Sequence, residues 1–223
     1  MSEADFKRRL FAGRRVAAKG HVGVTTFISK TLMCGKRWVP PRSGVIAKPK
    51  KRGAGRKVDL KRRGLYLGRR LDVALRRYIE DGTCAPQLSM VIARLERLDV
   101  RLVASQFRVA HPRLKIKTEL DAVGYVVQGA CLVPVVIELK NTQMTVAQHS
   151  DSYREPSPTN RYLSNGLLNS EKERHHLQAG FGCLGLKLAT GMCGYGLVVV
   201  NCRDGCVAYK VDAGKYGAAS LFA

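Results

Sequence analysis

The stretch Leu114–Lys140, LKIKTELDAVGYVVQGACLVPVVIELK, decides the fold of this chain. It predicts two strands joined by a tight turn, because Gly129 can adopt the positive φ that a two-residue hairpin turn needs at its first position. A turn centred on Gly129 and Ala130 places Asp121 directly opposite Glu138. Side chains alternate between the two faces of a strand, so we expect one polar and one apolar face. The expected polar face carries Glu119, Asp121, Glu138 and Lys140, with Glu119 opposite Lys140, and the expected core face carries Leu120, Ala122, Val126, Val135, Ile137 and Leu139.

The carboxylates of Asp121 and Glu138 suggest a metal site. Residues opposite each other in a hairpin have Cβ atoms about 4.5–5.5 Å apart, and like charges there cost stability unless a cation lies between them. Mg²⁺ is the natural candidate, because it binds one or two carboxylates together with substrate phosphate. The competing interpretation is a solvated strand face with a cross-strand ion pair.

An aspartate, a hairpin and then Glu138-Leu139-Lys140 resemble the active-site hairpin of the PD-(D/E)XK nuclease superfamily. The resemblance covers residues 99–211 and departs from the usual pattern at Leu120, where a proline often precedes the aspartate. It implies that Asp121 and Glu138 hold Mg²⁺ or Mn²⁺, with the Leu139 carbonyl within reach. It also implies that Lys140 orients or activates the attacking water.

The expected order of elements fits the same resemblance. Helical spacing of apolar residues predicts helices over residues 65–80 and 86–98, and apolar runs predict strands over 100–110, 195–202 and 207–211. Ser170 and Glu173 form a predicted capping box that opens a helix, and residues 141–169 are expected to form a long polar loop. The fold class is therefore α/β, or α+β-like, with the αβββαβ core of the PD-(D/E)XK superfamily.

The predicted helix that starts at Ser170 carries Gly180, Gly182 and Gly185, each of which lowers helix stability by about 1 kcal/mol relative to Ala. These glycines make sense only if the helix packs very close to the sheet. By the resemblance, Gln178 falls where many superfamily members place a glutamine near the site, although Gly182 replaces the tyrosine that usually follows. The alternative is that Gln178 is an ordinary polar helix position.

Other charged residues have weaker claims to the site. The superfamily sometimes adds an acidic residue from a helix before the sheet, and Asp72 and Glu80 are the candidates. An ion pair with a neighbouring arginine is the favoured interpretation for both. For His175 and His176 a surface or capping role is favoured over catalysis.

The net charge of +22 over 223 residues is concentrated at the N-terminus. Residues 1–80 contain 23 Lys and Arg against 5 Asp and Glu (+18), and residues 81–223 contain 16 against 12 (+4). This distribution predicts a polyanionic partner, with DNA favoured over RNA; acidic proteins or improved solubility are the alternatives. We expect a basic extension over residues 1–63, flexible over 39–63, and a nuclease-like domain over 64–223. Within the extension, Ser2 and Asp5 predict a capped helix with Phe6, Leu10 and Phe11 on one side.

Targeting signals and cysteines set further expectations. The seven cysteines have no zinc spacing, which favours reduced thiols in an intracellular protein. No apolar run of 18 residues suggests a membrane span, and the N-terminus does not resemble a secretory signal. The run Lys48-Pro49-Lys50-Lys51-Arg52 fits nuclear localisation or phosphate binding.

Four short segments resemble a core family of herpesvirus nuclear proteins, which are basic and carry a PD-(D/E)XK-like motif. They are Gly20-His21, Phe27, Ile137–Lys140 and Leu177-Gln178. This resemblance implies a viral protein of the nucleus or nucleolus.

Together these features predict a Mg²⁺-dependent DNA nuclease with Asp121, Glu138, Lys140 and Gln178 at its site. The alternative is a nuclear factor that binds nucleic acid or protein and keeps the fold without turnover. A ribosome-like RNA-binding protein would explain the basic arm but not the acidic pair.

Overall fold

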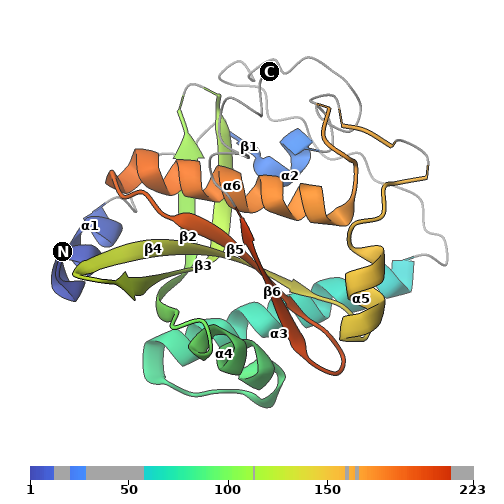
Figure 1. Cartoon of the computed structure of the whole chain (residues 1–223), viewed down its shortest axis with the longest axis horizontal. Helices are drawn as coiled ribbons and strands as arrows, with labels where there is room; N and C mark the ends of the chain where they lie inside the picture. Colours follow the sequence, from blue (N-terminus) through green and yellow to red (C-terminus); the bar gives the residue numbers. More distant parts are fainter. Residues whose placement is uncertain (13–20, 29–57, 113, 159–160, 164–165, 212–223) are drawn as a thin grey trace.

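A mostly open sheet of six strands lies between helices on both of its faces (Figure 1). This architecture comes from a computed structural model, which describes residues 1–12, 21–28, 58–112, 114–158, 161–163 and 166–211. The strands are β1 (Val22–Gly23), β2 (Arg101–His111), β3 (Ile116–Gln128), β4 (Cys131–Asn141), β5 (Tyr195–Asn201) and β6 (Cys206–Val211). The mixed α/β class expected from the sequence is confirmed.

The sheet is built around β3. β2 pairs antiparallel with β3 along one edge, and β1 (parallel) and β4 (antiparallel) pair with different parts of its other edge. β4 then pairs parallel with β5, and β5 antiparallel with β6. A parallel pair needs a crossover between its strands, and α6 (Glu171–Thr190) lies in the connection from β4 to β5.

The register of the β3–β4 hairpin is the one that the sequence predicted. Ala122 pairs with Ile137 and Gln128 with Cys131, and Gly129 in the turn has φ 58°. The register follows from alternation, since a slip of one residue would turn the apolar side chains away from the core.

The helices cover the two faces of the sheet unequally. α3 (Val58–Asp81), η2 (Pro86–Leu88) and α4 (Ser89–Glu96) bury Leu71, Leu75 and Ile92 against Ala122 and Ile137 on one face. α6 crosses the other face (Figure 1). α3 ends as expected, at Asp81 before Gly82, whose φ is 78°.

The close approach of α6 to the sheet depends on its glycines, as the sequence predicted. A Cβ on Gly182 would lie 2.7 Å from Leu120 Cδ2, and a Cβ on Gly185 would lie 2.5 Å from Val109 Cγ2. Ser170 caps the helix by accepting a hydrogen bond from the Glu173 N–H at 3.2 Å.

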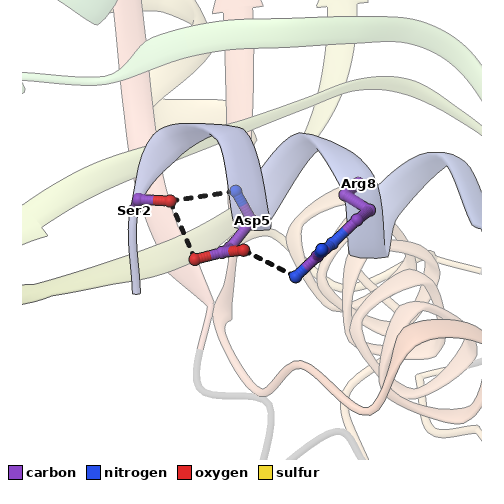
Figure 2. Close-up of polar contacts among 3 residues, drawn as sticks. All are labelled: Ser2, Asp5 and Arg8. Carbon is purple, nitrogen blue, oxygen red and sulfur yellow. Dashed lines mark hydrogen bonds and ion pairs between the residues drawn. The ribbon is translucent and has the colours of Figure 1, made fainter.

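The first helix, α1 (Glu3–Ala12), packs on the α6 side of the sheet. Figure 2 shows its cap, in which the Ser2 hydroxyl accepts from the Asp5 N–H at 3.1 Å and donates to the Asp5 carboxylate at 2.8 Å. Phe6 and Leu10 are buried, whereas Phe11 is 43% exposed.

Residues of the expected extension thus contribute to the core of the domain. The Tyr125 hydroxyl of β3 donates to Glu3 at 2.7 Å, which ties α1 to the sheet. β1 and α2 (Val24–Phe27) add an edge segment, with Val24 buried. α3 begins at Val58, inside the predicted flexible linker, and residues 39–57 of that linker lie outside the described residues.

The segment 141–169 is not wholly a loop, because it contains α5 (Val146–Ser152). Thr145 and Gln148 form a capping box there, with N-to-O distances of 3.2 and 3.0 Å. The Thr-x-x-Gln spacing was visible in the sequence. In the part of the chain that the structure describes, no helix is long and apolar enough to cross a membrane.

A glycine pair tests the packing of α6. Gly185→Ala should destabilise the fold by about 1–3 kcal/mol, because the overpacking against Val109 outweighs the gain in helix propensity. Gly68→Ala on α3 is the matched control: its Cβ would meet nothing within 4 Å, so it should stabilise by about 0.5–1 kcal/mol. Urea denaturation measures both, and equal effects would show that α6 can shift to make room.

Candidate functional site

The candidate site lies where β3 loses contact with β4. Along this edge of β3, β4 pairs with residues 122–128 and β1 with residues 116–117. The intervening residues, Thr118 to Asp121, have no strand partner on that edge among the described residues. The sheet is therefore split at Asp121.

The Asp121 side chain bridges this split. Its Oδ2 accepts a hydrogen bond from the Leu139 N–H of β4 at 2.6 Å, where a ladder bond would otherwise lie. On β2, Gln106 lies between the residues paired with Leu120 and Ala122 and has φ 49°, which is uncommon for a residue other than glycine.

The break in the strand also changes the face that Leu120 occupies. Ala122 and Ile137 pack toward α3 and α4, whereas Leu120 packs with Val136 beneath α6. The prediction that Leu120 and Ala122 share one face is therefore wrong. It assumed an unbroken ladder, and strict alternation fails where the backbone departs from regular pairing.

Glu138 and Lys140 are two residues apart on β4, so their side chains lie on the same face of the strand, where they pair with each other. Glu138 is 3% exposed, and the Lys140 Nζ, on a side chain that is 27% exposed, donates to Glu138 Oε1. The structure thus brings Asp121, Glu138 and Lys140 together. Glu119 is elsewhere: its carboxylate accepts from Arg108 Nε on β2 at 2.6 Å, so the predicted partnership with Lys140 is not formed.

Gln178 reaches the same place from α6. Burial raises the pKa of the Glu138 carboxyl, and a hydrogen bond with the Gln178 side chain is one of the smaller effects that oppose this rise. Gln178 therefore lies near Glu138 and lines the adjoining cavity, and its role at the site stays a prediction.

Burial makes the charges of this cluster interdependent. The pKa of Asp121 is raised well above its ordinary value, first by burial and then by the negative charge of Glu138. Burial also raises the pKa of Glu138, against the opposing effect of the Lys140 charge. Burial alone would lower the pKa of Lys140, but Glu138 and Asp121 outweigh it and the pKa is raised. The lysine is therefore held as an ammonium by the two carboxyl groups.

Asp72 of α3 belongs to this electrostatic cluster. Burial, followed by the charge of Glu119, raises the pKa of its carboxyl, and Lys140 lowers it. Asp72 in turn raises the pKa values of Asp121 and Glu138. Among the described residues Asp72 forms no ion pair with an arginine, so the favoured sequence interpretation is wrong. The alternative, a contribution of Asp72 to the site, stays a prediction.

A cavity of about 540 Å³ opens at the split of the sheet. Gly23 to Thr25 line it from β1 and α2, Arg108 to Ala110 from β2, Lys117 to Glu119 from β3, and Gln178 from α6. The cavity thus adjoins the Glu138 carboxyl through Gln178. Arg108 and Lys117 both line it, and Arg108 is paired there with the Glu119 carboxylate. Lys117, which forms no salt bridge among the described residues, suits an anionic group at this place.

The charge of Lys140 also acts on a histidine of α6, His175. Burial, reinforced by the Lys140 charge, lowers the pKa of His175 to about 2. The Tyr153 hydroxyl of the segment after α5 lies 3.4 Å from His175 Nδ1, and Tyr153 stacks on Tyr209 at 4.6 Å. His175 therefore adds a polar but uncharged ring, which differs from the surface role expected for it. His176 is buried and also departs from that expectation.

The oxygen donors fit a hard divalent cation in part. Asp121 and Glu138 supply two carboxyl groups, and the charge of a third acid, Asp72, acts on both of them. Within the described ranges no group of three or more His, Cys, Asp or Glu side chains is arranged to hold a metal. An ion here would therefore complete its ligands from main-chain carbonyls such as that of Leu139, from water and from substrate phosphate.

Comparison with known proteins adds little. No protein-family model matches the chain, and no curated protein matches it. A solved structure titled "Crystal structure of SSO0001" resembles it with a TM-score of 0.33 and 12% identity, over 95% of this chain and 78% of that chain.

The raised pKa of Asp121 predicts a pH dependence of stability. Between the ordinary and the raised pKa, the folded state keeps a proton that the unfolded chain has released, so folding stability falls as pH rises through this interval. Asp121→Asn removes this titration. Because only the wild type loses stability in this interval, the stability of the variant relative to wild type should increase from pH 4 to pH 8. The expected increase is about 1.4 kcal/mol per unit of pKa shift.

Urea denaturation in EDTA across that pH range measures the difference. A constant difference between Asp121→Asn and wild type would mean that Asp121 titrates normally in the folded protein.

Proposed function

We propose that this chain is a metal-dependent nuclease of the PD-(D/E)XK type that hydrolyses phosphodiester bonds in DNA. The observation that supports this best is the convergence of Asp121, Glu138 and Lys140 at the split between β3 and β4, with Gln178 on Glu138. With η2, α4 and α5 as additional helices, the order α3, β2, β3, β4, α6, β5 also supports the αβββαβ core of that superfamily.

In this proposal the two carboxylates hold Mg²⁺ or Mn²⁺, with the Leu139 carbonyl as a further ligand. The ion would supply Lewis-acid stabilisation of the phosphoryl oxygens and a bound water of lowered pKa. Lys140, kept as an ammonium by its acidic neighbours, would leave Glu138 when that carboxylate takes a cation and would orient the attacking water. Gln178 would hold the Glu138 carboxylate in position.

The cations around the site would position the substrate. Arg108 and Lys117 line the cavity beside Gln178, where a phosphate would lie. The basic residues of the 1–63 extension would add contacts to the DNA backbone that carry no base information. We also infer a nuclear or nucleolar protein of viral origin, on the basic run Lys48–Arg52 and the herpesvirus resemblance.

A second candidate is a nuclear factor that binds nucleic acid or protein and keeps the fold without turnover. The Lys140–Glu138 ion pair favours it, because an ammonium already neutralises the carboxylate that a metal would need. The two candidates differ in their response to metal.

Single substitutions at the site should abolish cleavage. Asp121→Asn, Glu138→Gln and Lys140→Ala should each lower the rate about a hundredfold or more, since each removes a metal ligand or the group that orients water. The assay follows supercoiled and linear DNA with Mg²⁺, Mn²⁺ or EDTA.

Glu96→Gln is the matched control, because Glu96 is an exposed carboxylate at the end of α4. It should cleave at the wild-type rate. Wild-type rates in any two of the three site variants would overturn the site assignment.

Metal should also stabilise the folded chain directly. Binding to the folded state raises its stability by RT ln(1 + [L]/Kd), about 2.7 kcal/mol at 100 times Kd. The melting temperature of wild type should therefore rise in millimolar Mn²⁺, and much less in Glu138→Gln. No shift in wild type, together with no cleavage product, would favour the second candidate.

A further inference from the structure

The outer face of α3 carries a basic hollow that the nuclease proposal does not use. A hollow of about 430 Å³ lies between this face and the segment that leads into η2. Its α3 side is lined by Tyr66, Arg69, Arg70, Val73, Ala74 and Arg77, and its other side by Thr83, Ala85 and Gln87. No acidic side chain lines it among those that the structure describes.

The three arginines of this hollow have no salt-bridge partner among the described residues. Arg8 and Arg108, by contrast, each pair with a carboxylate at 2.7 and 2.6 Å. Arg69, Arg70 and Arg77 are all exposed, so their donors face solvent. Arg77 interacts electrostatically with Asp81 one turn along α3, but without a salt bridge. Three guanidinium groups without a salt bridge around one hollow suit a ligand with several negative charges.

Tyr66 gives the hollow an aromatic wall. It is 60% exposed, and the Arg70 guanidinium carbon lies 5.8 Å from its ring centroid. Val73 beside it is 40% exposed. Exposed aromatic rings next to arginines are the combination by which proteins bind single-stranded nucleic acid, since bases stack on the ring while phosphates meet the cations.

The hollow is also close to the candidate site. Arg69 and Asp72 are three residues apart on one helix, which places their Cβ atoms about 5–6 Å apart. Asp72 acts electrostatically on Asp121 and Glu138. One side of α3 therefore contributes Asp72 to the acidic cluster, and the neighbouring side carries the arginines of the hollow.

We propose that the α3 hollow binds a segment of single-stranded nucleic acid, with a base on Tyr66 and phosphates on Arg69, Arg70 and Arg77. An acidic peptide would satisfy the arginines but would leave the exposed ring without a stacking partner. The inference does not need the hairpin to be catalytic, because binding at the hollow requires no metal.

The salt dependence of binding tests the phosphate contacts. The full chain is titrated into fluorescently labelled oligothymidylate in EDTA, and anisotropy gives log K against log salt. The triple variant Arg69→Gln, Arg70→Gln, Arg77→Gln should flatten the slope by about 2, because each single-strand phosphate contact contributes about 0.7.

A second triple variant removes the same charge elsewhere. Arg97, Arg154 and Arg203 are exposed and lie outside the hollow, so changing all three to Gln should leave the slope unchanged. Equal flattening in both triple variants would overturn the proposal, because overall charge would then explain the binding.

Tyr66 tests the stacking. Tyr66→Ala should weaken oligothymidylate binding roughly tenfold, whereas Tyr66→Phe should keep the wild-type affinity. A 5-iodouracil oligonucleotide should photo-cross-link to the peptide that contains Tyr66 in the full chain. Wild-type affinity in Tyr66→Ala, cross-linking only elsewhere, or equal competition by polyglutamate would reject the nucleic-acid assignment.

These outcomes are independent of the nuclease proposal. Asp121→Asn should bind oligothymidylate like wild type in EDTA even when it cleaves nothing, so loss of cleavage and loss of binding at the hollow are distinguishable.

Discussion

The hydrogen bond from the Leu139 N–H to the Asp121 carboxylate is the interaction on which the site depends. It holds β3 and β4 together at the point where their ladder ends, with a side chain in the role that a backbone carbonyl would otherwise fill. It fixes the carboxyl beside the main chain of Leu139. Among the described residues Thr118 to Asp121 have no strand partner on that edge, and Thr118 and Glu119 line the cavity that opens there.

The charges at this split are stable only as a group. Glu138 is almost fully buried, and a buried carboxylate without a partner costs several kcal/mol. Lys140 compensates Glu138 in the structure, while burial and the charge of Glu138 raise the pKa of Asp121. In our proposed function a divalent ion would take over this compensation from Lys140 and from the proton on Asp121.

The two long helices serve the site in different ways. α6 supplies Gln178 and can bring it to Glu138 because Gly182 and Gly185 allow the helix to lie against the sheet. α3 buries Leu71 and Leu75, adds Asp72 to the acidic cluster and turns its arginines outward. In our proposals one helix therefore orders the carboxylates and the other holds the nucleic acid beside them.

The sequence by itself determined the features that rest on local rules. The hairpin register followed from Gly129 and from alternation, the ends of α1, α3 and α6 from their capping residues, and the close packing of α6 from its glycines. The same local rules placed Asp121, Glu138 and Lys140 together, since all three belong to one hairpin.

Only the tertiary structure decided the rest, because those features depend on residues far apart in the chain. Because the ladder breaks at Asp121, Leu120 lies on the α6 face of the sheet. Glu119 pairs with Arg108 of β2 and not with Lys140. The packing of α3 across the sheet brought Asp72 to the acidic cluster. Strand alternation and helix periodicity describe a residue relative to its own element, whereas electrostatic partners are set by how separate elements pack.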